Sequence, residues 1–398
     1  MLKRKPTVAV ITTVRHNVGD DFVREGIIYL LRKKLGEAEI ALIHKHIPAT
    51  VRPEFEWIYS AGLTKVLNKF WGGGLLLSRV IDAFPPNRKT DKILNSDLLV
   101  QSGAPVYWCF ENGTGAHTNE WFKPLIKRRY LAIAPSVPFV NLGAGSCQPY
   151  YSDGSEFLGN ALCSSYIREL HSLCAVTTVR ESLSRQILNS LGLDAPVIAC
   201  PSIFARDHFS IPAHEPEYVA LNFMPLGGHY DLGQRIDKRR WEKVFVSFHD
   251  DIKKRYPVVL VCHNRKEFAV AGRLIPGARR YVASSSRDYL EFYSRTRFFI
   301  GCRVHGALAV ASFGRPAFVV GADTRAQMVD EIELRRSFVN EVDVDTLRGA
   351  YRDLEKTCST FAETFSAMRT KALNDYMLAL EPISLLLSSP TAPELRVG

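Results

Sequence analysis

One stretch of the chain decides the fold: Phe298-Phe-Ile-Gly-Cys-Arg-Val-His-Gly-Ala-Leu-Ala-Val-Ala-Ser-Phe-Gly-Arg-Pro-Ala-Phe-Val-Val320. Its apolar start predicts a buried strand that stops at Gly301, and the alanine-rich part from Gly306 has helical character. A second apolar run at 317–320 predicts another strand. Strand, helix and strand in this order are typical of a parallel sheet covered by helices.

Two polar side chains, Arg303 and His305, fall at the junction between this strand and this helix. In an open α/β sheet, ligands bind at such junctions. Arginine offers a planar fork for a carboxylate or a phosphate, and histidine donates or accepts a proton near neutral pH. A surface cap or a salt bridge is the commoner role of such a pair, but the apolar flanks favour anion capture beside acid/base chemistry.

The same alternation of short apolar runs and longer helical segments extends along most of the 398 residues. It predicts an α/β protein with two Rossmann-like doubly wound domains and a C-terminal helical segment. The expected limits are 1–209, 210–344 and 345–387, followed by a disordered tail at 388–398. Strands are expected at 7–12, 39–43, 97–101, 139–142, 175–179 and 197–200, and in the second domain at 218–223, 258–262, 298–300 and 317–320.

Composition restricts the partners and the compartment. A formal charge of +10 favours anionic partners, but the basic residues are scattered without regular aromatic interleaving, so we expect no nucleic acid partner. Contact with an anionic membrane surface stays open. The apolar runs are too short to span a bilayer, and the N-terminus does not resemble a signal peptide. We therefore expect a cytoplasmic protein that can also lie at the inner face of the membrane. The eight cysteines lack zinc spacing, and no metal site is expected.

Further candidate contacts follow other predicted strands. Asn17, Gly19 and Asp20 occupy the first strand-to-helix turn, where they either contact a ligand or only cap the helix. Arg180 ends the strand at 175–179 and either points into the same crevice or pairs with a neighbouring carboxylate. Arg325 follows the strand at 317–320, so it is expected near the Arg303 and His305 pair.

Two glycine-bearing loops complete the set. Ser102 and Gly103 follow the strand at 97–101 and are candidates to present donors to an anion or a sugar. Trp108, shortly after them, is a candidate to stack on a sugar ring, although a core position is the commoner fate of such a residue. Gly143 and Gly145 form a third loop, which lacks the last glycine of a dinucleotide-binding fingerprint.

Together these elements resemble the polysaccharide pyruvyl transferase family. The resemblance is carried by Asn17-x-Gly19-Asp20, the loop around Gly103, Gly143-x-Gly145, Thr178-Val-Arg180-Glu-x-Leu183-Ser184, and Arg303-x-His305 with Gly314-x-Pro316. It implies a fold similar to GT-B glycosyltransferases, with the two domains facing a cleft, and phosphoenolpyruvate as the donor of a pyruvate ketal to a glycan or lipid-linked sugar.

By the same resemblance Arg180 and Arg303 hold the donor, helped by Arg325, and His305 is the acid/base residue. The scheme requires no metal and no cofactor besides phosphoenolpyruvate as co-substrate. Three positions depart from the family pattern: Cys200 stands where an aspartate is usual, Arg325 where a lysine is usual, and Ser102 where the first glycine of a Gly-Gly pair is usual. Two other functions therefore stay open, a nucleotide-sugar glycosyltransferase on the same fold and a sugar-binding relative without activity.

Overall fold

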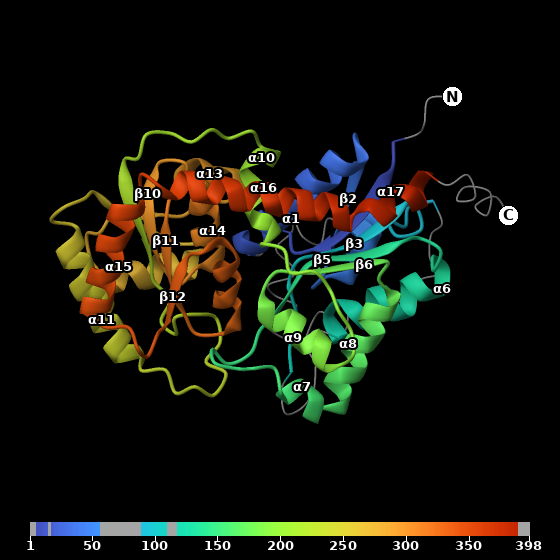
Figure 1. Cartoon of the computed structure of the whole chain (residues 1–398), viewed down its shortest axis with the longest axis horizontal. Helices are drawn as coiled ribbons and strands as arrows, with labels where there is room; N and C mark the ends of the chain where they lie inside the picture. The colour runs from blue at the N-terminus through green and yellow to red at the C-terminus, as the bar shows by residue number, and fades with distance from the viewer. Residues whose placement is uncertain (1–4, 15–16, 56–88, 110–117, 389–398) are drawn as a thin grey trace.

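The computed structural model describes residues 5–14, 17–55, 89–109 and 118–388, and it shows two parallel β-sheets side by side with helices packed around them (Figure 1). The first sheet has the strand order β2-β1-β3-β5-β6, and the short β4 pairs with the end of β5. Its strands are β1 (Thr7–Thr12), β2 (Glu39–His44), β3 (Leu98–Ser102), β4 (Pro105–Tyr107), β5 (Phe139–Ser146) and β6 (Val176–Val179).

Helices of the first half connect these strands. They are α1 (Val18–Leu35), the π-helix η3 (Thr118–Tyr130), α6 (Leu131–Ile133), α7 (Glu156–Gly159), α8 (Ala161–Leu173), α9 (Ser182–Ser190), and the short 3₁₀ helices η1 (Pro48–Val51) and η2 (Pro53–Phe55). The 3₁₀ helix η4 (Pro201–Phe204) and α10 (Ala205–His208) lead toward the second half. Asn17 caps α1, because its side-chain oxygen accepts from the backbone nitrogen of Gly19 at 3.2 Å.

The second sheet has the strand order β9-β8-β7-β10-β11-β12, all parallel. In chain order this is 3-2-1-4-5-6, the arrangement in which the ligand crevice opens between the first and fourth strands. The strands are β7 (Tyr218–Asn222), β8 (Val258–Val261), β9 (Arg280–Tyr281), β10 (Thr296–Gly301), β11 (Ala317–Gly321) and β12 (Arg335–Phe338). Their connections contain α11 (Lys238–Ile252), α12 (Arg265–Leu274), α13 (Ser286–Tyr293), α14 (Val304–Ser312) and the 3₁₀ helix η5 (Thr324–Ile332).

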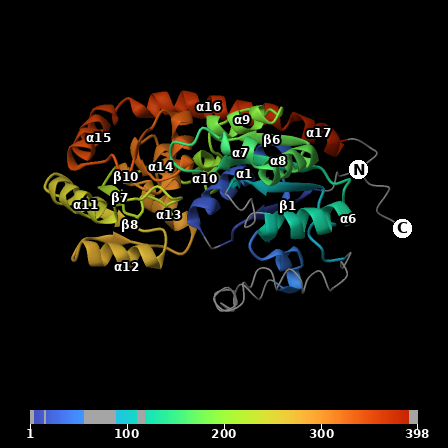
Figure 2. The same ribbon diagram turned by 90° about the horizontal axis from the view of Figure 1, so that it is seen from below.

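Three helices end the described chain: α15 (Val344–Thr357), α16 (Phe361–Ala379) and α17 (Glu381–Ser388). Figure 2 shows them along one long side of the molecule. The long α16 begins on the second half and crosses to the first, where the hydroxyl of Tyr376 donates to the carbonyl of Ala199 at 3.1 Å. Glu381 of α17 pairs with Lys34 of α1. The absence of strands from this segment was predicted, and the domain limits stay predictions.

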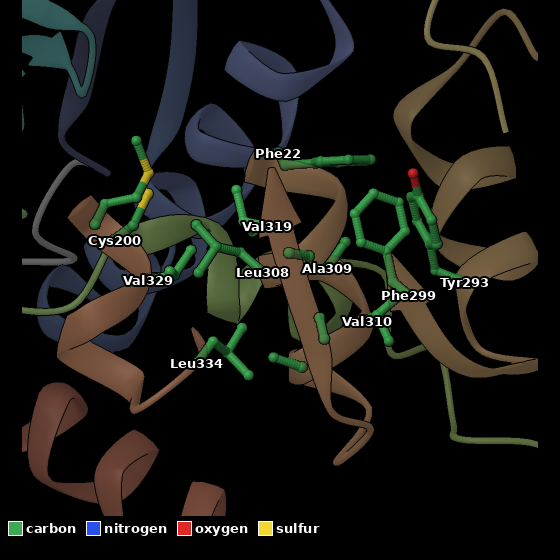
Figure 3. Packing of buried hydrophobic residues seen from close by; sticks show 14 of the residues in the cluster. Phe22, Cys200, Tyr293, Phe299, Leu308, Ala309, Val310, Val319, Val329 and Leu334 are labelled. Carbon is green, nitrogen blue, oxygen red and sulfur yellow. The ribbon is translucent and has the colours of Figure 1, made fainter. Parts of the chain in front are cut away.

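The apolar core is continuous between the two halves. Leu308 of α14 packs in one cluster with Val319 of β11 and, from the first half, with Phe22 of α1 and with Cys200 (Figure 3). At Gly26 of α1 an added methyl group would overlap the backbone of η4, so only glycine permits this close helix contact. Because α1 and α14 are packed together in this way, the residues at their N-terminal ends hold fixed positions relative to each other.

Several expected elements were wrong. The strand expected at 197–200 is reduced to a single bridge between Val197 and Val179, because Pro201 starts a 3₁₀ helix instead. The third glycine loop is not a loop: β5 continues through Ser146, and Gly143, with φ of +65°, lies where the pairing register with β6 shifts. The edge strands β9 and β12 were not predicted, because each is short and polar at an exposed edge.

Candidate active site

A pocket lies where the carboxyl ends of the strands of both sheets face each other. Side chains from the first half come from the β1–α1 turn, from Pro105 and from Arg180 after β6. Those from the second half follow β7, β8, β10 and β11. The lining residues are Asn17, Gly19, Asp20, Pro105, Arg180, Met224, Gly227, Gly228, His229, His263, Cys302, Arg303, Val304, His305, Gly321, Ala322, Asp323, Arg325, Ala326 and Met328. Seven of the predicted site residues are thus brought together.

Arg303 directly follows β10 and precedes the first turn of α14. Its guanidinium is buried, and Glu267 of α12 accepts from both Nε, at 3.1 Å, and Nη2. Its Nη1 lies 2.6 Å from Nε2 of His229. Glu267 therefore fixes one edge of the Arg303 fork and balances its charge, while the remaining edge faces the pocket residue His229.

Arg180 is the most deeply buried cation of the pocket, with 1% of its surface exposed. Its nearest carboxylate, Glu181, lies 3.7 Å from Nε, and two guanidinium nitrogens, Nε and Nη1, have no hydrogen-bond partner among the described residues. Oε1 of Glu181 accepts from the backbone of Ser146 at 2.5 Å, whereas Oε2, the oxygen nearer to Arg180, has no hydrogen-bond partner among the described residues. Arg180 thus combines parts of both predicted roles: it lies in the crevice, and it pairs with a neighbouring carboxylate only at a distance.

Arg325 is paired within its own loop. Asp323 accepts from its Nε at 2.8 Å and from its Nη2 at 2.6 Å, which is the bidentate geometry that neutralises a guanidinium best. The guanidinium also lies over the ring of Tyr230, 5.4 Å from its centre. Of the three arginines that line the pocket, Arg303 and Arg325 are therefore charge-balanced by carboxylates in hydrogen-bond contact, whereas Arg180 is not.

His305 lies in the first turn of α14, against the β1–α1 turn. A methyl group on Gly19 would come within 2.6 Å of its Nδ1, so the glycine leaves the space for this ring. Its Nε2 is buried without a partner among the described residues. Burial, followed by the positive charge of Arg180, lowers the pKa of His305 to about 3. The imidazole is therefore neutral near pH 7.

Asp20 completes the first-half side of the pocket. Its carboxylate lies 3.6 Å from Nζ of Lys45, and the hydroxyl of Thr13 donates to it at 3.3 Å. Burial alone would raise the pKa of Asp20, but the charges of Lys45 and Arg180 outweigh burial and hold the pKa below its ordinary range. A permanent carboxylate and a neutral imidazole thus share one wall of the pocket.

Five predicted contacts do not line the pocket. Ser102 and Gly103 are buried at the end of β3, where an added methyl on Gly103 would lie 2.7 Å from the carbonyl of Gly143. Gly143 and Gly145 belong to β5, and Gly145 leaves space for the Arg180 guanidinium. Trp108 is mostly buried, with its ring edge-on to Tyr230 at 4.9 Å. These residues are therefore buried near the pocket without lining it, and Cys200 is buried in the same way.

Three residues of the pocket region were missed from the sequence: His229, His263 and Glu267. His263 could have been found, because it follows β8 just as Arg303 follows β10. His229 follows a glycine pair beyond β7, which is a weaker signal. Glu267 lies within α12 and reaches Arg303 only because β8 and β10 flank β7 in the sheet. Trp71 and the three glycines after it are a further candidate from the sequence for shaping an acceptor site, and they lie in the segment 56–88, outside the described residues.

Gly145 offers a test of the Arg180 position. A methyl group there would lie 2.5 Å from Nε of Arg180, so Gly145→Ala is expected to displace the guanidinium and to weaken anion binding about tenfold or more. Isothermal titration with phosphoenolpyruvate measures the effect. The matched control is Gly349→Ala in α15, where no atom lies within 4 Å; it should leave binding unchanged and stabilise the helix by about 0.5–1 kcal/mol. If both variants bound phosphoenolpyruvate equally well, Gly145 would not be needed to leave space for Arg180.

The lowered pKa of His305 predicts a pH dependence of stability. An unfolded histidine binds a proton below about pH 6.5, whereas folded His305 stays neutral down to about pH 3. The folded state is therefore fully stabilised above pH 6.5 and loses this contribution as the pH falls, by about 2 kcal/mol at pH 5. Urea unfolding at several pH values between 7.5 and 5 gives the free energy of unfolding as a function of pH. In His305→Asn the slope of this free energy against pH should correspond to about one proton fewer taken up on unfolding than in the wild type. An unchanged slope would refute the assignment.

The pocket offers cation and proton chemistry. Within the described ranges, no group of three or more His, Cys, Asp or Glu side chains is arranged to hold a metal ion. In the same part of the chain, no helix has the length and apolar character needed to cross a membrane.

The fold and the pocket define an α/β protein with two parallel sheets and a pocket between them. A model of the polysaccharide pyruvyl transferase family matches residues 17–324, which include every pocket position except Arg325, Ala326 and Met328. The chain belongs to this family, and the family is one of transferases. The resemblance seen in the sequence is thereby confirmed. No curated protein matches the chain by sequence.

Solved structures confirm the predicted GT-B-like fold class. A Listeria monocytogenes protein assigned as UDP-N-acetylglucosamine 2-epimerase aligns with a TM-score of 0.53 at 13% identity, covering 97% of this chain and 98% of that one. The UDP-GlcNAc 2-epimerase of Neisseria meningitidis, solved with UDP-GlcNAc, gives 0.50 at 12% identity, covering 95% and 99%. At such low identity the likeness establishes the fold alone.

Proposed function

We propose that this protein transfers the enolpyruvyl group of phosphoenolpyruvate onto two hydroxyls of a sugar, giving a cyclic pyruvate ketal during assembly of a surface polysaccharide. The observation that carries the proposal is Arg180, a buried cation with two unpartnered nitrogens in the described structure, in one pocket with Arg303, Arg325 and His305. A buried cation with unused donors is stabilised by an anion. Phosphoenolpyruvate brings both a carboxylate and a phosphate to such a site.

The proposed reaction needs one proton delivered and two removed. A proton adds to the methylene carbon of phosphoenolpyruvate, which makes the central carbon electrophilic. One sugar hydroxyl adds to that carbon and loses its proton, and the phosphate leaves with the electrons of its carbon–oxygen bond. The second hydroxyl then adds to the same carbon, loses its proton and closes the ring, and the departing phosphate carries away one of the released protons. Arginines stabilise the charge on the leaving phosphate.

His305 is the residue that we assign to the proton transfers. In the empty pocket its ring is neutral, because burial and Arg180 lower its pKa. A bound phosphoenolpyruvate would place negative charge beside the arginines and so raise the pKa of His305 toward neutrality. The ring would then be charged as an acid only when the donor is in place. Asp20, on the same wall, is a permanent carboxylate suited to accept a hydrogen bond from a sugar hydroxyl.

The acceptor in this proposal is a glycan or a lipid-linked sugar, bound on the side of Asn17 and Asp20. The scheme uses phosphoenolpyruvate as co-substrate and no other cofactor. We place the reaction in the cytoplasm, and at the inner face of the membrane if the acceptor is lipid-linked. Cys200, at the departure from the family pattern, does not line the pocket: its thiol is buried and accepts from the hydroxyl of Ser202 at 3.3 Å.

A thermal-shift assay with phosphoenolpyruvate tests the proposal. We expect the donor to raise the unfolding midpoint of the wild type, Arg303→Ala to abolish the rise, and His305→Ala to keep most of it. If phosphoenolpyruvate did not raise the unfolding midpoint while UDP- or GDP-sugars clearly did, the proposal would be refuted and a nucleotide-sugar glycosyltransferase would be favoured. Binding of phosphoenolpyruvate without phosphate release in the presence of any glycan would indicate a relative without activity.

A further inference from the structure

His263 is a buried histidine that neither the sequence motifs nor the proposed chemistry uses. It follows β8 by two residues and lines the pocket, and only 7% of its surface is exposed. Its backbone nitrogen donates to Oε2 of Glu267 at 3.0 Å. On its ring, Nε2 lies 2.7 Å from the hydroxyl of Tyr293, whereas Nδ1 has no partner among the described residues. One ring nitrogen is thus held by the core and the other is unused.

The ring is fixed in orientation by its surroundings. Tyr289 packs against it with ring centres 5.2 Å apart, and Phe22 of α1 meets it edge-on at 6.2 Å. Tyr293, which contacts Nε2, is fully buried in α13. A ring held on three sides cannot turn its Nδ1 toward another group of the protein at low cost.

The hydrogen bond with Tyr293 selects one tautomer. If Nε2 carried the proton and donated to Tyr293, the buried hydroxyl proton would be left without an acceptor in the described structure, and the lone pair of Nδ1 would be unused as well. If the Tyr293 hydroxyl donates to Nε2 instead, the only unused group is the N–H at Nδ1. The second arrangement leaves fewer buried groups unsatisfied and is therefore the more stable.

The ring stays uncharged beside the arginines. Burial, followed by the charge of Arg303, holds the pKa of His263 well below its ordinary range. The ionisable pocket residues that interact with it are Arg303, His229 and His305, and Glu267 accepts from its backbone nitrogen. His263 therefore adds a directed donor to the pocket without adding a charge.

We propose that His263, held in the Nδ1–H tautomer by the hydroxyl of Tyr293, donates a hydrogen bond to an anionic oxygen of the donor substrate. The inference rests on the proposed function, because it takes phosphoenolpyruvate as that substrate. His263 then acts next to Arg303 as a neutral binding residue, and Tyr293 is a positioning residue that sets which nitrogen carries the proton.

Two substitutions separate the ring nitrogens. The amide nitrogen of asparagine occupies about the position of Nδ1, and that of glutamine about the position of Nε2. We expect His263→Asn to bind phosphoenolpyruvate within about threefold of the wild type and His263→Gln to lose about tenfold to a hundredfold in affinity. Isothermal titration gives both dissociation constants, and thermal unfolding without ligand shows that each variant is folded.

The nitrogen-15 spectrum of histidine-labelled protein reads the tautomer directly. It should show His263 protonated at Nδ1 in the wild type, and a changed or mixed tautomer in Tyr293→Phe together with weaker binding. Equal affinity of wild type and His263→Gln, or a proton on Nε2 in the wild type, would overturn this inference while leaving the proposed function intact. Absence of phosphoenolpyruvate binding to the wild type would instead remove the proposed function, and this inference with it.

Discussion

Replacing Arg180 with methionine is expected to abolish measurable binding of phosphoenolpyruvate, with a loss of at least about a thousandfold in affinity, while the protein remains folded. The guanidinium is almost fully buried, and the two of its nitrogens that have no partner in the described part of the chain are the donors that an anion would complete. Truncating one partner of a buried charged contact costs on the order of 4 kcal/mol, which corresponds to this factor. Isothermal titration measures the affinity.

The folded state should tolerate this change. Methionine removes two donors that have no partner among the described residues, and Glu181, whose pKa burial already raises, can take up a proton when the cation 3.7 Å away is lost. We therefore expect the unfolding midpoint to move by no more than a few degrees. Arg180→Lys should bind more weakly than wild type but better than methionine, because it keeps the charge and loses the fork.

The matched control is Arg185→Met in the same segment. Arg185 is exposed and pairs with Asp194 at 2.8 Å, outside the pocket. Its replacement should leave the affinity for phosphoenolpyruvate unchanged. If Arg180→Met bound the donor as well as Arg185→Met does, Arg180 would not be the anion receptor and the main support of the proposed function would be gone.

Replacing His305 with glutamine should lower kcat by about a hundredfold to ten-thousandfold while the affinity for phosphoenolpyruvate stays within about threefold. Glutamine is polar and similar in length but cannot take up and release a proton near neutral pH. Since His305 is neutral in the empty pocket, its charge contributes little to capture of the donor. Phosphate released from phosphoenolpyruvate in the presence of glycan acceptors measures kcat.

His249→Gln is the control for this substitution. His249 is also buried, but it lies on α11 beside Asp250, away from the pocket residues. It should keep both kcat and donor affinity. If His305→Gln lost donor affinity in proportion to its activity, His305 would be a binding residue, and another group would have to supply the proton.

Much of the site was predictable because its residues follow strands. A strand and its helix are recognised from local periodicity, and the carboxyl ends of parallel strands meet at one edge of a sheet. Arg180, Arg303 and His305 could therefore be assigned to one crevice from the sequence, and the structure places all three in one pocket. His263 obeys the same rule and was missed only because no motif pointed to it.

The glycines show where sequence reasoning failed. Gly143 and Gly145 were expected to form a ligand loop, but β5 runs through them, and Gly145 serves Arg180 by leaving room for its guanidinium. The sequence shows the position of a glycine in the chain. It does not show which atom from another part of the fold would clash with a side chain at that position. Only the packed structure could assign that role.

The sequence by itself determined the two doubly wound domains, the helical C-terminus and the family, since these follow from local periodicity and motif order. The tertiary structure alone decided which arginine is left for a ligand. Asp323 pairs with Arg325 within one loop, but Glu267 reaches Arg303 from another helix, and two nitrogens of Arg180 have no partner among the described residues. The contact of Glu267 with Arg303 depends on a distance between segments far apart in the chain, and such distances have no signature in local sequence.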